Sequence, residues 1–268
     1  MPETNENKLL ELKNLSVTLE KSDRTTATLL TDLNLSIKKN QRIALIGQSG
    51  CGKTMTSRAI LGLLPDNIKI SSGQIHFNDQ IVNHDDESAM EDLRGKKIAL
   101  IFQEPQAALN PVFQVGTQIT DVIKTNFKLK KKEARERALA MLLHVGFFDA
   151  QEIFKMYPGQ LSGGMAQRVL IAMALSCQPE LIIADEPTSA LDAITQSKIL
   201  KLIFDLQEKF QFAFMIISHD IPLIKKYVDD VFIMKEGKIV FTGAIKNLPY
   251  PNPDPYLQSL FETLPDVL

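Results

Sequence analysis

The sequence predicts an α/β fold, and three features of its apolar pattern support this. Two N-terminal segments, 9–19 and 29–37, partly alternate apolar and polar residues, as half-buried antiparallel strands do. Short continuous apolar runs follow, and such runs are typical of parallel strands that are covered on both faces. Each run leads through glycine, proline, serine or charged residues into a helical pattern, as repeated β–α units do. The runs lie at residues 43–46, 98–102, 181–184 and 213–217.

The middle of the chain, residues 104–168, has only helical patterns and no comparable strand. The clearest patterns span 115–125 and 131–143, with proline and glycine between them. We therefore expect a mostly helical insertion in the α/β core. Its basic run LKKKEARER (129–137) is expected to be a solvated helix face, because glutamates are interspersed among its basic residues.

Composition and charge exclude several classes of protein. The 268 residues include 30 Lys+Arg and 32 Asp+Glu, a formal charge of −2, which argues against binding nucleic acid by bulk charge. The longest apolar run, 169–177, is far shorter than the roughly 20 residues that span a bilayer. The polar N-terminus lacks the features of a secretion signal. Two cysteines, Cys51 and Cys177, cannot form a disulfide framework or a four-cysteine zinc site, so we expect a cytosolic chain.

The segment GQSGCGKT (47–54) fits the phosphate-binding pattern G-x-x-x-x-G-K-[ST] and directly follows the apolar run 43–46. Glycines allow successive backbone N–H groups to face phosphate oxygens, and the following helix start favours an anion. Lys53 is expected to reach the β- and γ-phosphates, and Thr54 to supply an oxygen to Mg²⁺. Cys51 is interpreted as a small filler rather than a nucleophile. The predicted nucleotide-binding residues here are Gly47, Gln48, Ser49, Gly50, Cys51, Gly52, Lys53 and Thr54.

The segment LIIADE (181–186) is an apolar strand that ends in two carboxylates. In a parallel sheet such ends lie at the edge where ligands bind. Asp185 is expected to bind Mg²⁺, directly or through water, and Glu186 to act as the general base for the attacking water. This pattern is weak alone, and the phosphate-binding motif upstream strengthens it.

The segment LSGGMAQR (161–168) predicts a Ser-Gly-Gly turn that opens a helix. Ser162, Gly163 and Gly164 before a helix N-terminus form a second potential anion site. One ATP does not need two such sites in one chain, whereas a dimer can hold the same phosphates from opposite sides. The alternative is an ordinary helix cap made by Ser162.

Taken together, these motifs resemble the ATP-binding-cassette (ABC) family of transport ATPases over essentially the whole chain. The motifs occur in the family's order: GQSGCGKT, FQEP, LSGGMAQ, LIIADE, SALD and ISHD. The resemblance implies that Gln103 senses Mg²⁺ and the attacking water, that Asp192 contacts the partner subunit, and that His219 holds the γ-phosphate. The cofactors it implies are ATP and Mg²⁺. It also implies a P-loop NTPase core with an N-terminal antiparallel β portion, a helical insertion and a short C-terminal extension.

The expected organisation has four parts. Residues 1–103 would form the N-terminal β portion and the P-loop part of the core, and 104–168 the helical subdomain. Residues 169–247 would complete the core, and 248–268 would form the C-terminal extension.

Several segments also resemble the peptide/nickel importer branch of the family. These are QEPQAALNP, LSGGM in place of LSGGQ, ALDAITQSKIL and PDPYLQSL. The resemblance implies an energy-coupling ATPase for import of peptides, nickel or metal chelates, peripheral at the cytoplasmic face of the inner membrane. Its implied partners are a second, non-identical cassette, transmembrane permease subunits and, indirectly, an extracytoplasmic solute-binding protein, with no nucleic acid. A permease helix would dock near Gln103–Pro111. Another importer branch is the alternative.

Two positions depart from the family pattern. Leu19 stands where an aromatic residue usually stacks on adenine, and leucine offers no π-face for the base. Asp254 stands where the C-terminal extension commonly has histidine before a Pro-Tyr pair. The first departure puts base selectivity in question, and the second puts the role of the extension in question.

Two rival functions remain open. One is a soluble, non-transport ABC ATPase in DNA repair or on ribosomes, but the chain has neither paired cassettes nor a long coiled-coil arm. The other is a module that binds nucleotide without turnover, and a purely structural site would require neither Glu186 nor His219.

Overall fold

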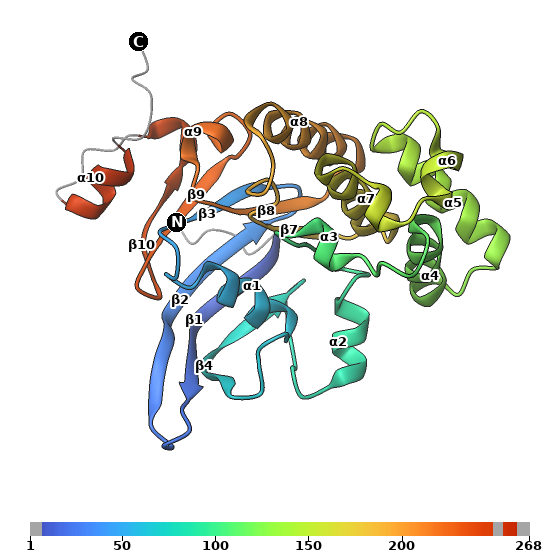
Figure 1. Ribbon diagram of the computed structural model, residues 1–268. Coiled ribbons are helices and arrows are strands. Elements are labelled where there is room, and N and C mark those ends of the chain that lie inside the picture. Colours follow the sequence, from blue (N-terminus) through green and yellow to red (C-terminus); the bar gives the residue numbers. More distant parts are fainter. Residues whose placement is uncertain (1–6, 249–253, 262–268) are drawn as a thin grey trace, which may run out of the picture. The chain divides into compact units, whose positions relative to one another are not determined.

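The computed structural model describes residues 7–248 and 254–261 (Figure 1). The chain divides into two compact units. The first unit combines residues up to Val82 with residues from Met215 onward, and the second is Asn83–Phe214. None of the helices in the described part of the chain has the length and apolar character that a bilayer crossing requires.

The first unit contains a long antiparallel hairpin and the strand that leads into the P-loop. Its elements in chain order are β1 (Lys8–Glu20), β2 (Thr26–Lys38), β3 (Arg42–Ile46), α1 (Lys53–Leu61), β4 (Ile68–Phe77), β5 (Gln80–Ile81), β8 (Ala213–Ser218, which begins in the second unit), α9 (Ile221–Ile224), β9 (Asp230–Lys235), β10 (Lys238–Ala244), the 3₁₀ helix η2 (Ile245–Asn247) and α10 (Pro255–Phe261). The antiparallel strands predicted at 9–19 and 29–37 are confirmed as β1 and β2.

Strand pairing in this unit follows the pattern of apolar residues. One sheet has the order β2-β1-β4-β5, and the apolar side chains of β1 and β2 are buried in it. The parallel strand predicted at 43–46 is confirmed as β3, which pairs in parallel with β9, while β9 and β10 form an antiparallel hairpin. The side chains of residues 43–46 are fully buried, as the continuous apolar run predicts.

The second unit contains the helical insertion and two parallel strands. Its elements in chain order are α2 (Glu87–Leu93), β6 (Ile98–Ile101), α3 (Pro105–Ala108), α4 (Val115–Phe127), α5 (Lys131–His144), α6 (Ala150–Lys155), η1 (Pro158–Gln160), α7 (Gly163–Ser176), β7 (Leu181–Asp185) and α8 (Ala193–Phe210). β6 and β7 pair in parallel, which confirms the runs at 98–102 and 181–184 as strands. The helical character predicted for residues 104–168 is also confirmed.

The basic run at the start of α5 corrects one expectation. Lys131 and Lys132 are exposed, as a solvated face requires. Arg137, in contrast, stacks on the ring of Phe127 with its guanidinium carbon 4.1 Å from the ring centroid, and burial lowers its pKa. Arginine can stack in this way because its guanidinium is planar and weakly hydrated. The run is therefore solvated only in part.

Candidate active site

The P-loop connects the end of β3 to the start of α1. Gly52 adopts a φ of +110°, a left-handed conformation that residues with a side chain rarely reach, and α1 begins at the next residue. No side chain caps the N-terminus of α1, so its first N–H groups keep their capacity to bind an anion. The structure thus supports the geometry expected from the motif.

The P-loop is held in place by the rest of the first unit. Gly237, in the turn between β9 and β10, donates its N–H to the carbonyl of Cys51 at 2.9 Å and accepts a bond from Thr31 of β2. Cys51 is buried, and this burial raises the pKa of its thiol. A buried neutral thiol is a poor nucleophile, which agrees with the interpretation of Cys51 as a filler.

Lys53 lies within the loop rather than on its surface. The side chain is only 5% exposed, and Nζ donates hydrogen bonds to the carbonyls of Gly47 and Gln48 at 2.7 and 3.0 Å. Both partners are neutral, so these bonds orient the ammonium group without cancelling its charge. That charge is available to an anionic ligand.

Glu186 follows β7 in an unusual backbone conformation. Its φ is +45°, and Ser189 donates both its N–H and its hydroxyl to the Glu186 carbonyl, which holds the turn. Non-glycine residues in this region cluster at functional sites, where the fold compensates for the strain. The preceding residue, Asp185, is buried at the end of the strand.

Gln103 and Glu186 are brought together by the pairing of β6 with β7. Each residue lies just beyond the carboxyl end of its strand, and Gln103 Nε2 donates to Glu186 Oε2 at 3.2 Å. The bond fixes one carboxylate oxygen of Glu186. The sequence predicts roles for both residues, and the structure shows that their side chains meet.

The predicted Ser-Gly-Gly turn lies beside the N-terminus of α8. Ser162 caps the N-terminus of α7, because its hydroxyl accepts a hydrogen bond from the N–H of Met165 at 3.3 Å. The helix cap that the sequence offers as the alternative to an anion site is therefore present. A side chain at Gly164 would lie 2.9 Å from Thr195 Cγ2, so the close approach of the two helices requires a small residue there. The role of this turn in binding phosphate stays a prediction.

Asp192 caps α8 close to the same turn. Its carboxylate accepts the N–H of Thr195 at 3.0 Å, and hydrogen bonds from Thr195 hold the pKa of Asp192 below its ordinary value. Asp192 is therefore a carboxylate at neutral pH. It lies on the surface, where a partner subunit could reach it, and that contact stays a prediction.

His219 lies in the first unit, in the loop after β8. Its side chain is exposed, and the loop around it is ordered by two hydrogen bonds of Asp220, one from its N–H to the Ser218 hydroxyl and one from the N–H of Leu223 to its carboxylate. The predicted site residues are thus divided between the units. Leu19, residues 47–54 and His219 belong to the first unit, and Gln103, Ser162, Gly163, Gly164, Asp185, Glu186 and Asp192 belong to the second.

Leu19 lies near the end of β1, between Ala27 of β2 and Ile68 of β4, and is partly exposed. An aliphatic side chain here can pack against a base but cannot distinguish one base from another by ring stacking.

We expect GTP to compete with ATP better than in aromatic-bearing relatives, and Leu19→Tyr to tighten ATP binding by about three- to tenfold. Competition titrations with the two nucleotides measure both effects, with Ile81→Tyr as an exposed control. Strict preference of the unchanged chain for ATP over GTP would contradict the prediction that Leu19 weakens base selectivity.

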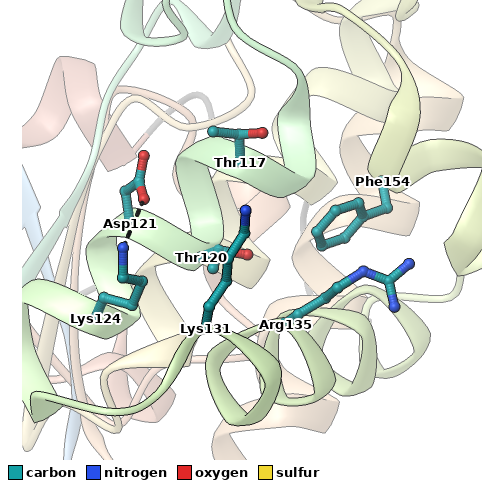
Figure 2. A pocket seen from close by; sticks show the side chains of 7 residues that line it. All are labelled: Thr117, Thr120, Asp121, Lys124, Lys131, Arg135 and Phe154. Atoms are coloured by element: carbon teal, nitrogen blue, oxygen red, sulfur yellow. Dashed lines mark ion pairs between the residues drawn. The ribbon is translucent and has the colours of Figure 1, made fainter.

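The second unit also has a pocket that the sequence does not reveal. Figure 2 shows that α4, α5 and α6 surround it, and its volume is about 340 Å³. Three of its lining residues are basic, one is acidic, and Asp121 pairs with Lys124 at 3.8 Å. The lining residues are Thr117, Thr120, Asp121, Lys124, Lys131, Arg135 and Phe154.

Comparison with known proteins identifies the family. The family model described as ABC transporter matches residues 30–189, more than half of the chain. The chain belongs to the ABC transporter family. Its expected fold, an α/β P-loop NTPase core of the ABC type, and its expected activity as an ABC-type ATPase are both confirmed.

Relatives and solved structures of ABC proteins match nearly the whole chain. The oligopeptide transport ATP-binding protein AppD of Bacillus subtilis is 42% identical over 87% of this chain and 71% of its own length. The dipeptide transport ATP-binding protein DppD of Escherichia coli is 38% identical over 87% and 72%. The structure of cbiO1 from Clostridium perfringens, part of the ABC transporter complex cbiONQ, matches with a TM-score of 0.78 at 30% identity over 91% of both chains. The dimeric cassette MJ0796, bound to ADP and Pi, matches with the same TM-score at 28% identity over 88% of this chain and 99% of its own.

Proposed function

We propose that this ABC cassette hydrolyses ATP to drive the import of peptides through a membrane permease. The observation that carries the catalytic part is the hydrogen bond from Gln103 to Glu186, which orients a carboxylate at the end of β7. The names of the relatives, oligopeptide and dipeptide transport ATP-binding proteins, support the peptide as cargo. Nickel or a metal chelate is the alternative cargo.

In this proposal each site residue has a defined role toward the nucleotide. Lys53 and the backbone N–H groups of the P-loop bind the β- and γ-phosphates. Glu186 accepts a proton from the attacking water, and the bond from Gln103 keeps its carboxylate in one orientation. His219 donates to the γ-phosphate, and Leu19 packs against the base.

The donor atoms of the predicted metal ligands suit Mg²⁺. Thr54 offers a hydroxyl oxygen, Asp185 a carboxylate and Gln103 an amide oxygen, and Mg²⁺ prefers oxygen ligands from few protein groups together with phosphate. The Nε2 of Gln103 is directed to Glu186, which leaves its amide oxygen for a cation. When bound, Mg²⁺ would neutralise charge on the phosphates.

We further propose that two cassettes close over ATP, the second being a non-identical ABC subunit. Ser162, Gly163 and Gly164 of one cassette would contact the phosphates held by the P-loop of the other. This is supported by the exposure of Ser162 at the N-terminus of α7, a helix of 14 residues, because a helix N-terminus favours an anion. Asp192, ionised and exposed on the neighbouring helix, would contact the partner across the same boundary.

The proposed permease contact lies around Gln103–Pro111 and the two residues that follow. Val112 and Phe113 are 69% and 51% exposed, and adjacent exposed apolar side chains of this size favour burial by a partner. A short helix of a transmembrane permease subunit would cover them. The chain would then be peripheral at the cytoplasmic face of the inner membrane, with a solute-binding protein delivering the cargo to the permease.

The proposal predicts that Phe113→Ser weakens assembly with the permease, because it removes an exposed apolar contact. Phe148→Ser is the matched control, since Phe148 is 100% exposed and lies away from this stretch in the sequence. The chain would be co-expressed with the permease subunits and the second cassette, and the amount that co-purifies would be measured. We expect a loss of about tenfold for Phe113→Ser and none for the control.

The same complex, reconstituted in vesicles, tests the cargo. ATP-dependent uptake of labelled oligopeptides supports the proposal, whereas uptake of nickel alone would reassign the cargo to the metal. Co-sedimentation with ribosomes or DNA in place of the permease would favour the soluble rival function and overturn import.

A further inference from the structure

The C-terminal helix α10 contacts the phosphate-binding loop through one tyrosine. Tyr256 is 9% exposed, and its hydroxyl donates to the carbonyl of Met234 at 2.8 Å and accepts the N–H of Gln48 at 3.2 Å. Gln48 is the second residue of the P-loop, and Met234 lies in β9. One side-chain hydroxyl therefore bridges the loop and the neighbouring strand, all within the first unit.

This bridge lies where the ladder between β3 and β9 ends. Ile46 and Ile233 are the last paired residues, and at the next position a side chain on Gly47 would lie 2.4 Å from the Met234 carbonyl oxygen. Immediately beyond, the Tyr256 hydroxyl joins Met234 to the N–H of Gln48. The tyrosine thus adds a side-chain link to the strand pairing at the point where the P-loop begins.

Gln48 transmits this contact to the phosphate-binding lysine. While its N–H is bonded to Tyr256, its carbonyl accepts Lys53 Nζ at 3.0 Å and the N–H of Cys51 at 3.3 Å. The peptide groups on both sides of Gln48 are therefore fixed, one by the tyrosine and one by the loop itself. Loss of the tyrosine hydroxyl would free the N–H of Gln48 and loosen the groups that orient Lys53.

The helix that carries Tyr256 is built to hold the hydroxyl in place. Asp254 accepts the N–H of Tyr256 at 2.7 Å, so the residue that departs from the family's histidine orders the first turn of α10. Leu257 is buried beside it, and Lys235 Nζ lies 5.1 Å from the centroid of the tyrosine ring. Burial raises the pKa of Tyr256, so its hydroxyl keeps the proton that it donates to Met234.

We propose that Tyr256 is a positioning residue for ATP binding, acting through Gln48 to hold the P-loop and Lys53 in a phosphate-binding arrangement. The C-terminal extension would thereby set nucleotide affinity from outside the sequence motifs. This inference rests on nucleotide binding by the P-loop, so ATP binding of the unchanged chain is measured in parallel.

Tyr256→Phe tests the proposal, because it removes the hydroxyl and keeps the ring. We expect the dissociation constant for ATP and the KM to rise by about three- to tenfold, as loss of a hydrogen bond that orders the loop implies, while kcat changes less than about twofold. Hydrogen exchange in peptides that cover residues 43–53 should accelerate, and exchange in the hairpin of β1 and β2 should not change. A variant with unchanged ATP affinity and unchanged loop exchange would overturn the proposal.

Tyr227→Phe is the matched control, because it makes the same chemical change in the same unit, outside α10 and the P-loop. We expect its ATP affinity to stay within about twofold of that of the unchanged chain. If Tyr227→Phe weakens ATP binding as much as Tyr256→Phe does, the effect does not depend on the Tyr256 bridge and the positioning role is wrong. If the unchanged chain fails to bind ATP, the fault lies in the P-loop assignment instead.

Discussion

Glu186→Gln is expected to abolish ATP turnover and leave ATP binding intact. Glutamine has nearly the same size and keeps a side-chain oxygen that can accept the bond from Gln103 Nε2, now 3.2 Å from the carboxylate. The backbone at φ +45° is no harder for glutamine than for glutamate. An amide, however, cannot take a proton from the attacking water, so the rate should fall by about 100- to 10,000-fold. Phosphate release and a fluorescent-nucleotide titration measure the two quantities.

The control for this variant is Glu91→Gln, which makes the same chemical change on the exposed face of α2 in the same unit. Its turnover should match that of the unchanged chain. Normal steady-state hydrolysis by Glu186→Gln would refute the assignment of the general base. Loss of ATP affinity in that variant would show that the Glu186 carboxylate holds the site together rather than activating water.

The parallel strands could be predicted from the sequence because their burial is complete. Continuous apolar runs have no polar face, and β3 and β7 are buried at nearly every position, so the pattern and the environment agree. The long N-terminal strands were predictable for the opposite reason, since alternation marks a sheet with one buried face. In both cases local sequence is sufficient because the pattern of apolar residues matches the burial of the strand.

Other strands depend on pairing that local sequence does not express. β4 carries the polar stretch Ser71–Gln74, exposed at every position, which is typical of a turn, and only its ladder with β1 makes it a strand. β9 is absent from the predicted strands although its run VFIM is of the kind that predicts β3, so a usable signal was present there.

The candidate site, like the strands, has features that local sequence predicts and features that depend on contacts between distant parts of the chain. The motifs predict which residue types bind phosphate and activate water, because those chemistries need a lysine, glycines and a carboxylate in a fixed order. The bond between Gln103 and Glu186 arises from the pairing of β6 with β7, which the motifs do not encode. The positive φ of Glu186 is held by bonds from Ser189 to its carbonyl. Tyr256 lies 208 residues from Gln48 in the chain, and no local pattern links a C-terminal tyrosine to a loop N–H.

Lys53→Ala is expected to remove most nucleotide affinity, the reverse of the result for Glu186→Gln. The variant deletes a buried ammonium group whose charge the Gly47 and Gln48 carbonyls orient but do not neutralise. Charge-assisted bonds to phosphate are about twice as strong as neutral ones, so the dissociation constant for ATP should rise by about 100-fold. Lys39→Ala, which removes an exposed lysine from the same unit, should leave that constant unchanged. Because turnover depends on both residues but binding on only one, measuring the two variants together separates phosphate binding from water activation. An unchanged dissociation constant for Lys53→Ala would mean that the P-loop does not hold the nucleotide.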